Sequence, residues 1–549
     1  TDISGLLATP NSGNGISLTD SPGNTIGGIN VQDRNIIYGG INLAGANTTG
    51  NKIIGNYLGP DITGQTALGQ GGGISISDAS NNEVGPGNVI SGNINHGLHF
   101  TGQNASNNRV FGNYFGLAAD GNTPMGNQNR NIVIENAPNN RIGGLTSDSL
   151  NVISASVNED GILLFGANAY GNQIVGNYIG TNASGDQAVG NAQRGVIIAA
   201  EATNNIIGPN NVISGNVNWG IQIYHITATG NKVINNLIGT DATGTQPLDN
   251  GQANVYITNS PGNLVDGNTI CGAGGGQPGG PGIELLGVDT WNTVISNNFI
   301  GTNANGDQGL GNGSVGIVAY KGASNNNIGP NNVISGNGGG IEFFGAETDS
   351  MHVFGNYIGT NQSDAADIGN MYSGINITDS SAFNTIGPGN VISNNGDIGI
   401  QINTPGAVYN RIIGNLIGTT SDGMSALGNG EFGILCAAPY TTIGGLLEEE
   451  QNVVSANSPG IVIGSDDGSG NCIIQGNYIG TDITGNGALL NEGTGLTLNN
   501  STSNIVGGLE PGARNVIGSM GIVNLAATNN KVIGNYIGIR ADGSGPIDN

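Results

Sequence analysis

Gly176–Thr181 reads Gly-Asn-Tyr-Ile-Gly-Thr, and this hexapeptide recurs nine times along the chain in exact or lightly varied form. Its asparagine falls at Asn56, Asn113, Asn177, Asn236, Asn298, Asn356, Asn415, Asn477 and Asn535. From the first copy to the last is 535 − 56 = 479 residues in eight intervals, or about 60 residues per repeat. A fixed period of this kind indicates stacked units, because one unit cannot bury its apolar face alone.

Three shorter signatures share the period: Asn-Val-Ile-Ser, Asn-x-Ile-Gly and, twice per period, Gly-Ile-x-Ile, as at Ile74 and Leu98. Each is a short β-branched run bounded by Gly and Asn, which is typical of strands between sharp corners. Three strands per turn account for all of them, with a short turn and a long turn in each period. Nine periods therefore predict about eighteen turns of a single-stranded parallel β-helix, about 85 Å long at one strand spacing per turn.

Asparagines at equivalent corners are predicted to stack as amide ladders, each amide donating and accepting one hydrogen bond along the axis. A β-propeller is the alternative all-β architecture for a repeat protein. It would need longer strands and aromatic anchors, and only 5% of the residues are aromatic. The fold class is therefore predicted to be an all-β solenoid.

The period is not interrupted by any linker, so residues 1–549 are predicted to be one domain. Thr1–Gly5 matches Thr481–Gly485 in the middle of a repeat, and the last residues stop in the same kind of loop. Neither end shows a clear cap. The chain is therefore either a segment of a longer protein or a unit whose ends meet other copies of itself.

The chain is acidic, with 12 Lys and Arg against 38 Asp and Glu and a net charge of −26. This balance disfavours nucleic acids and anionic membrane surfaces as partners, and no apolar run is long enough for membrane insertion. Cys271, Cys436 and Cys472 have neither a disulfide framework nor metal-ligand spacing. Low charge density, acidity and β-stacking favour an extracellular or cell-surface location.

The full repeat reads Gly-Asn-Tyr-Ile-Gly-Thr-Asp-x-Thr-Gly-x-x-Ala-Leu-Gly-Asn, most clearly at Gly55–Gly69 and Gly476–Leu489. This module resembles the repeat of large bacterial surface and secreted proteins of the pectate-lyase-like superfamily. The resemblance covers nearly the whole chain and implies a right-handed β-helix. It leaves the function open, because that superfamily includes lyases, hydrolases, epimerases, adhesins and surface-layer components.

Two glutamates are the candidate catalytic residues. Glu284 and Glu342 occupy the outward position of Gly-Ile-x-Ile two turns apart, which is about 9–10 Å by strand spacing. That separation is near the upper limit for the two carboxyl groups of an inverting glycosidase. Acids placed by chance on a solvated strand explain them equally well. A lyase is disfavoured, because no Asp cluster surrounds a lone Lys or Arg in the sequence.

Calcium is the only metal that the sequence suggests. Asp61, Asp241 and Asp482 lie in Thr-Asp-x-Thr-Gly loops, and stacked loops of oxygen ligands could bind Ca²⁺. Local Asx turns are the favoured interpretation, because other copies carry Asn182 or Asn303 instead. We therefore expect no cofactor and no metal site, with Ca²⁺ as the alternative.

The third position of the hexapeptide is tyrosine in six of its nine copies. The residues at this position are Tyr57, Tyr114, Tyr178, Leu237, Phe299, Tyr357, Leu416, Tyr478 and Tyr536. Such a column could stack sugars, but the leucines favour a packing role.

Regular turns without long insertions predict a non-enzymatic extracellular structural protein: a stiff surface fibre, stalk or head-to-tail filament subunit. Its predicted partners are copies of itself and polysaccharide. The alternatives are a carbohydrate-active enzyme (polysaccharide lyase or glycoside hydrolase) or a carbohydrate-binding adhesin of the same fold. In those cases, the least regular stretch, Cys271–Pro281, is where we expect a cleft.

Overall fold

The computed structural model describes residues 4–7, 13–68, 71–274, 279–464, 469–518 and 521–547. The chain divides into two compact units, Thr1–Gly280 and Pro281–Asn549, and each is described by itself. The assignment of residues 1–549 to a single domain stays a prediction.

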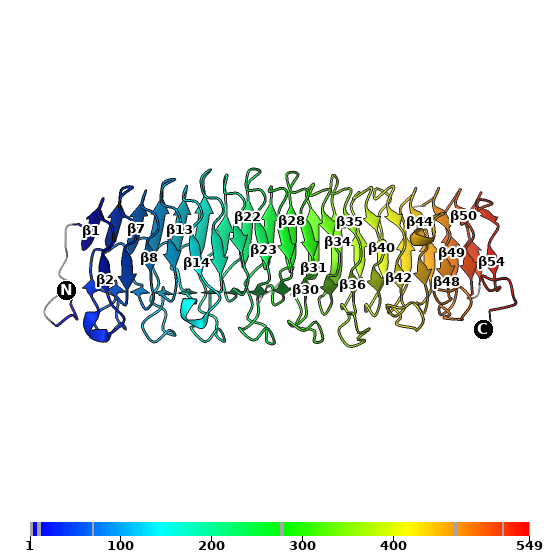
Figure 1. Ribbon diagram of the computed structural model, residues 1–549. Coiled ribbons are helices and arrows are strands. Elements are labelled where there is room, and N and C mark those ends of the chain that lie inside the picture. Colours follow the sequence, from blue (N-terminus) through cyan, green and yellow to red (C-terminus); the bar gives the residue numbers. More distant parts are fainter. Residues whose placement is uncertain are drawn as a thin grey trace. The chain divides into compact units, whose positions relative to one another are not determined.

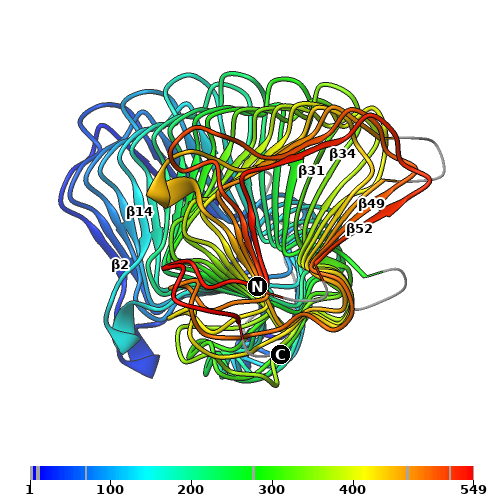
Figure 2. The same ribbon diagram turned by 90° about the vertical axis from the view of Figure 1, so that its right-hand side faces the viewer.

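Each turn consists of three strands, which belong to three parallel sheets called A, B and C. A short turn runs through Ile74–Ser77, Glu83–Val84 and Val89–Ile90, and the next, long turn begins at Leu98–Thr101. Within each unit, successive turns follow one another in chain order (Figure 1), and in the end-on view they share one outline (Figure 2). The order of strands predicted from the repeat is confirmed.

The first unit contributes nine described strands to each sheet. Sheet A contains β1 (Ile16–Thr19), β4 (Ile41–Ala44), β7 (Ile74–Ser77), β10 (Leu98–Thr101), β13 (Ile132–Glu135), β16 (Ile162–Phe165), β19 (Val196–Ile198), β22 (Ile221–Tyr224) and β25 (Val255–Thr258). Sheet B contains β2 (Thr25–Gly27), β5 (Lys52–Ile54), β8 (Glu83–Val84), β11 (Arg109–Val110), β14 (Arg141–Gly143), β17 (Gln173–Val175), β20 (Ile206–Ile207), β23 (Lys232–Ile234) and β26 (Leu264–Asp266). Sheet C contains β3 (Ile36–Ile37), β6 (Tyr57–Leu58), β9 (Val89–Ile90), β12 (Tyr114–Phe115), β15 (Val152–Ile153), β18 (Tyr178–Ile179), β21 (Val212–Ile213), β24 (Leu237–Ile238) and β27 (Thr269–Ile270).

The second unit repeats this arrangement, again with nine described strands per sheet. Sheet A contains β28 (Ile283–Leu286), β31 (Val315–Tyr320), β34 (Gly339–Phe344), β37 (Ile375–Ile377), β40 (Ile400–Ile402), β43 (Ile434–Cys436), β46 (Ile461–Ile463), β49 (Leu496–Asn499) and β52 (Ile522–Leu525). Sheet B contains β29 (Val294–Ser296), β32 (Asn327–Ile328), β35 (His352–Val353), β38 (Thr385–Ile386), β41 (Arg411–Ile412), β44 (Thr442–Gly444), β47 (Ile473–Gln475), β50 (Ile505–Gly507) and β53 (Lys531–Ile533). Sheet C contains β30 (Phe299–Ile300), β33 (Val333–Ile334), β36 (Tyr357–Ile358), β39 (Val391–Ile392), β42 (Leu416–Ile417), β45 (Val453–Val454), β48 (Tyr478–Ile479), β51 (Val516–Ile517) and β54 (Tyr536–Ile537).

The described residues also form three short 3-10 helices in loops: η1 (Val31–Asp33), η2 (Ser147–Ser149) and η3 (Glu448–Glu450). None of the helices in the described part of the chain is long and apolar enough to span a membrane.

The core of each unit lies inside the coil. In β7, Ile74 and Ile76 are buried, whereas Ser75 and Ser77 are partly exposed, because successive side chains of a strand point to opposite faces. The strands pair in register, so Ile74 lies beside Leu98 and buried aliphatic side chains stack along the axis. The outward residue of Gly-Ile-x-Ile is therefore the position from which sheet A presents functional groups.

Asparagine ladders satisfy the polar backbone at the corners. The Nδ2 of Asn177 donates to the Oδ1 of Asn211 at 3.0 Å, while its own Oδ1 accepts from the Nδ2 of Asn151 at 2.9 Å. The same amide also donates to the carbonyls of Ile142 and Val175. All three asparagines are fully buried, so these bonds replace hydrogen bonds to water. The predicted ladders are confirmed.

The second glycine of the hexapeptide is required by close approach of the next turn. Gly180 has a φ of 89°, a conformation that most side chains avoid, and a Cβ there would lie 2.2 Å from the carbonyl oxygen of Ser214. The described parts of both units are thus built on a parallel β-helix of about eighteen turns.

Candidate functional site

The two predicted glutamates lie on one outward column of sheet A in the second unit. Glu284 pairs with Val318, which pairs with Glu342, so the carboxyl groups are two turns apart with one aliphatic side chain between them. At one strand spacing per turn the separation is about 9–10 Å. Asn376 and Gln401 continue the column on the next two strands.

Glu342 opens onto a pocket of about 290 Å³. The pocket is lined by Val315, Gly339, Ile341, Glu342, Tyr372, Ser373, Asn376, Asp397 and Gln401. The Nδ2 of Asn376 donates to Glu342 Oε1 at 3.1 Å. The other amide atom, Asn376 Oδ1, is buried without a hydrogen-bond partner in the described residues. The pocket thus combines a carboxyl group with an unused acceptor, which suits a ligand that carries hydroxyl groups.

An aromatic pair flanks the other glutamate. The Tyr320 hydroxyl donates to Glu284 Oε1, and the Tyr320 ring stacks on Phe344 with ring centroids 4.7 Å apart. Both rings come from strands of six residues, β31 and β34, which are longer than most strands of sheet A. Each ring lies two residues beyond the column position of its strand, on the same face, which places aromatic side chains beside the carboxylate column.

Partial burial shifts both carboxyl groups toward the protonated form. Burial raises the pKa of Glu284, while the hydrogen bond from Tyr320 and the charge of Lys321 oppose that rise. Burial also raises the pKa of Glu342; the hydrogen bond from Asn376 opposes it, and the charge of Asp379 adds to it. A cation therefore acts on Glu284, whereas an anion acts on Glu342. This difference favours Glu342 as the proton donor of the pair.

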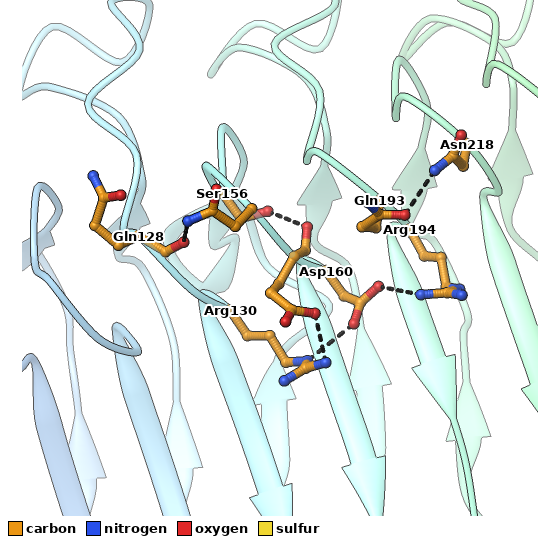
Figure 3. Close-up of polar contacts among 9 residues, drawn as sticks. Gln128, Arg130, Ser156, Asp160, Gln193, Arg194 and Asn218 are labelled. Carbon is orange, nitrogen blue, oxygen red and sulfur yellow. Dashed lines mark hydrogen bonds and ion pairs between the residues drawn. The ribbon is translucent and has the colours of Figure 1, made fainter.

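A second polar cluster, which the sequence had not revealed, lies in the first unit (Figure 3). Asp160 is fully buried between two arginines: Arg130 Nε donates to its Oδ2 at 2.9 Å, and Arg194 Nη1 donates to its Oδ1 at 3.1 Å. Glu159 accepts from Arg130 at 2.7 Å. This is one buried aspartate shared by two arginines, not the cluster of aspartates around a lone basic residue that a lyase would need.

The cluster forms because its members share one corner position. Arg130, Asp160 and Arg194 each lie two residues before the first residue of a sheet A strand, so they stack on successive turns. Arg194 also lies over the Trp219 ring at 5.1 Å, and Trp219 stacks on Tyr256. Reading that one position down the repeat would have revealed the column. Its charges are paired with each other, which points to a structural role.

The predicted calcium ligands bond within their own loops. Asp61 accepts from Thr63 Oγ1 at 2.6 Å, and Asp482 accepts from Thr484 Oγ1 at 2.7 Å. Burial would raise the pKa of Asp61, but hydrogen bonds from Thr63 and nearby backbone amides outweigh it, so that pKa is lowered. Asp241 shows the same pattern of bonds and the same lowered pKa. The described residues contain no group of three or more His, Cys, Asp or Glu that could hold a metal ion.

Calcium removal is expected to leave the protein unchanged, because local donors already occupy these carboxylates. Adding excess EGTA should shift the thermal unfolding midpoint by less than about 1 °C. Calorimetric titration with CaCl₂ checks the same point, since bound calcium would release or absorb heat. A rise of several degrees on adding calcium, lost in a triple variant with Asn at 61, 241 and 482, would instead establish the calcium site.

The stretch Cys271–Pro281, where a cleft was expected, lies partly outside the described residues, at 275–278.

No protein-family description matches the chain, and neither does any curated protein sequence. Solved structures do match. The periplasmic alginate epimerase AlgG is 12% identical over 91% of this chain and 78% of its own, with a TM-score of 0.27. The A-module of Azotobacter vinelandii mannuronan C-5 epimerase AlgE4 is 13% identical over 91% of both chains, with a TM-score of 0.21. The tailspike protein of E. coli bacteriophage HK620, in complex with a pentasaccharide, is 11% identical over 90% and 73%, with a TM-score of 0.29.

These structures are right-handed parallel β-helix proteins, which bears out the resemblance seen in the sequence. The prediction of a non-enzymatic fibre, stalk or filament subunit is wrong by the same comparison. Two of the three are epimerases, and carbohydrate-active enzymes predominate among the similar structures. The physical reason for the error is that regular turns fix the scaffold, whereas chemistry depends on the few side chains that the scaffold presents.

Proposed function

We propose that the protein is a carbohydrate-active enzyme that hydrolyses glycosidic bonds at Glu284 and Glu342. One observation carries the proposal: two half-buried carboxyl groups, both with raised pKa, lie two turns apart on one outward column beside a pocket. A chance acid on a solvated strand would be exposed and would keep an ordinary pKa.

The asymmetry of the pair assigns the roles. Glu342, where the charge of Asp379 adds to the effect of burial on the pKa, would donate a proton to the leaving oxygen of the scissile bond. Glu284, held by Tyr320 and near Lys321, would accept a proton from the attacking water. A separation of about 9–10 Å leaves room for that water and corresponds to hydrolysis with inversion at the anomeric carbon.

The charges near the pair favour a neutral glycan. Asp397 lines the pocket and Asp379 acts on Glu342, while Lys321 is the one cation whose charge acts on the pair in the described residues. A uronate would meet like charge there. Structural polysaccharides lie mainly outside the cytoplasm, and AlgG is periplasmic, so we place the protein in the extracellular space or the periplasm.

A screen of soluble polysaccharides tests the proposal. We expect the purified chain to release reducing ends from soluble neutral polysaccharides such as glucomannan or arabinan. NMR of the first product should show that the configuration at the anomeric carbon is inverted. Release of unsaturated products absorbing in the ultraviolet would indicate a lyase instead. Absence of any cleavage across neutral and uronate polymers would refute the enzymatic assignment.

A further inference from the structure

A groove in the first unit runs over the outer face of sheet C, away from the glutamate pair. It begins as a pocket of about 550 Å³, a volume typical of ligand sites, and three tyrosines of the hexapeptide line it: Tyr57, Tyr114 and Tyr178. A second pocket of about 360 Å³ starts at Tyr178 and includes Leu237. The repeat position of the hexapeptide therefore marks one continuous track on this unit.

The tyrosines recur on every second strand. Tyr57 pairs with Val89, which pairs with Tyr114, and Tyr114 is linked to Tyr178 through Val152 in the same way. Two strand spacings separate consecutive tyrosines by about 9.6 Å. That spacing is close to the length of a disaccharide in an extended 1,4-linked chain whose backbone bonds are equatorial.

The rings are fixed before any ligand arrives. Each lies against the glycine of its own Asp-x-Thr-Gly-type loop: a Cβ on Gly64 would lie 2.8 Å from Tyr57 Cε2, and one on Gly185 would lie 2.8 Å from Tyr178 Cε2. The Arg34 guanidinium lies 3.9 Å above the Tyr57 ring. A ring already held in place loses little conformational freedom on binding, which favours affinity.

Packing alone does not require tyrosine at this position. Leu237 and Leu416 replace it in β24 and β42, and both strands keep the same pairing as the tyrosine copies. The hydroxyl and the aromatic ring are thus additional to what the fold needs. Tyr114 and Tyr178 are partly exposed and present flat apolar surfaces with polar tips, which is the surface that a pyranose ring contacts through its C–H face and hydroxyls. Tyr57 is 7% exposed, with Arg34 over its ring, and ends the groove.

We propose that this groove is a binding site for an extended, 1,4-linked polysaccharide, which it engages in disaccharide steps without cleaving it. It is lined by one carboxylate, Asp148, in the described residues, and so lacks the paired acids of hydrolysis. The site would hold the polymer on the protein independently of the catalytic pair. Several weak contacts to one polysaccharide chain raise the overall affinity, because the sugar units are covalently linked.

The test uses the full chain carrying Glu342→Gln, so that binding is measured without hydrolysis. Glucomannan and hydroxyethyl cellulose serve as ribbon-like 1,4-linked probes, and dextran, a flexible 1,6-linked glucan, serves as the comparison. Affinity electrophoresis and calorimetry with 1,4-linked oligosaccharides should show binding to the ribbon probes only. Affinity should rise by one step from a disaccharide to a tetrasaccharide, which would reach both Tyr114 and Tyr178.

Tyr114→Leu is the decisive variant, because the chain itself shows that leucine is accepted at this position. We expect it to weaken ribbon-glycan binding about tenfold, a loss in keeping with removal of one stacking ring. Its thermal midpoint should stay close to that of the parent. Tyr478→Leu makes the same change in the second unit and should not alter binding.

Three results would overturn the proposal. They are unchanged binding by Tyr114→Leu, equal binding of dextran, and equal losses in Tyr114→Leu and Tyr478→Leu. Because the assay never depends on bond cleavage, a failed hydrolysis screen leaves its outcome unaffected. The groove and the catalytic assignment are thus refuted separately.

Discussion

Replacing Glu342 by glutamine is expected to lower kcat for glycan hydrolysis about 10³-fold, within the usual contribution of a general acid. Glutamine keeps the shape and can still accept the hydrogen bond from Asn376, so the pocket should stay intact. What it removes is the proton that the leaving oxygen needs. Initial rates of reducing-end release by wild type and variant, at saturating substrate, give the comparison.

The pH dependence separates a lost proton donor from a damaged pocket. Because burial raises the pKa of Glu342, wild-type activity should fall on the alkaline side as that carboxyl loses its proton. Glu342→Gln should remove this alkaline limb, while the acidic limb, set by protonation of Glu284, remains. Glu510→Gln, which neutralises an exposed acid in a late turn of the same unit, is the matched control. Retention of more than about a tenth of the activity by Glu342→Gln would exclude it as the acid.

Asp160→Asn is expected to cost about 3 kcal/mol of unfolding free energy, near the lower end for breaking a buried ion pair. Asn has the same shape, but it carries no charge and turns an N–H group toward one of the two arginines. Arg130 and Arg194 are 24% and 23% exposed, so water can partly solvate them, which limits the loss. Urea unfolding followed by circular dichroism measures the change.

The neighbouring acid provides the control for this change. Glu159 also contacts Arg130, but its side chain is 38% exposed, and an exposed ion pair contributes at most about 1 kcal/mol. Glu159→Gln should therefore be nearly neutral. Equal destabilisation by the two variants would show that burial between the arginines is not what makes Asp160 important.

The repeat made the scaffold predictable, because the same short strands and corner asparagines recur at matching positions. Asn177 and its neighbours in the ladder could be assigned from spacing alone, and so could the outward side chains of Glu284 and Glu342. The partners of these glutamates could not. Tyr320 reaches Glu284 from the next turn because it lies on the same outward face as Val318, two residues further along β31.

The charged cluster of the first unit was hidden for a related reason. Asp160 meets Arg130 and Arg194 across intervals of 30 and 34 residues, so unequal turn lengths obscure their alignment in the sequence. The function was mispredicted because it was inferred from the regularity of the turns. Regularity describes how the backbone is built, and the same backbone can carry structural or catalytic side chains.

The asparagine ladder also says how such a chain can change in length over evolution. Asn151 and Asn211 bond to the two sides of Asn177 and lie 60 residues apart. When a stretch of that length is duplicated or deleted within a unit, equivalent asparagines therefore become neighbours again and the ladder stays continuous. Loss of a single turn would instead bring two long or two short turns together. Each duplicated repeat thus adds one tyrosine position and lengthens the groove by about one disaccharide. Recombination can in this way change the length of polymer that the groove binds while the core stays the same.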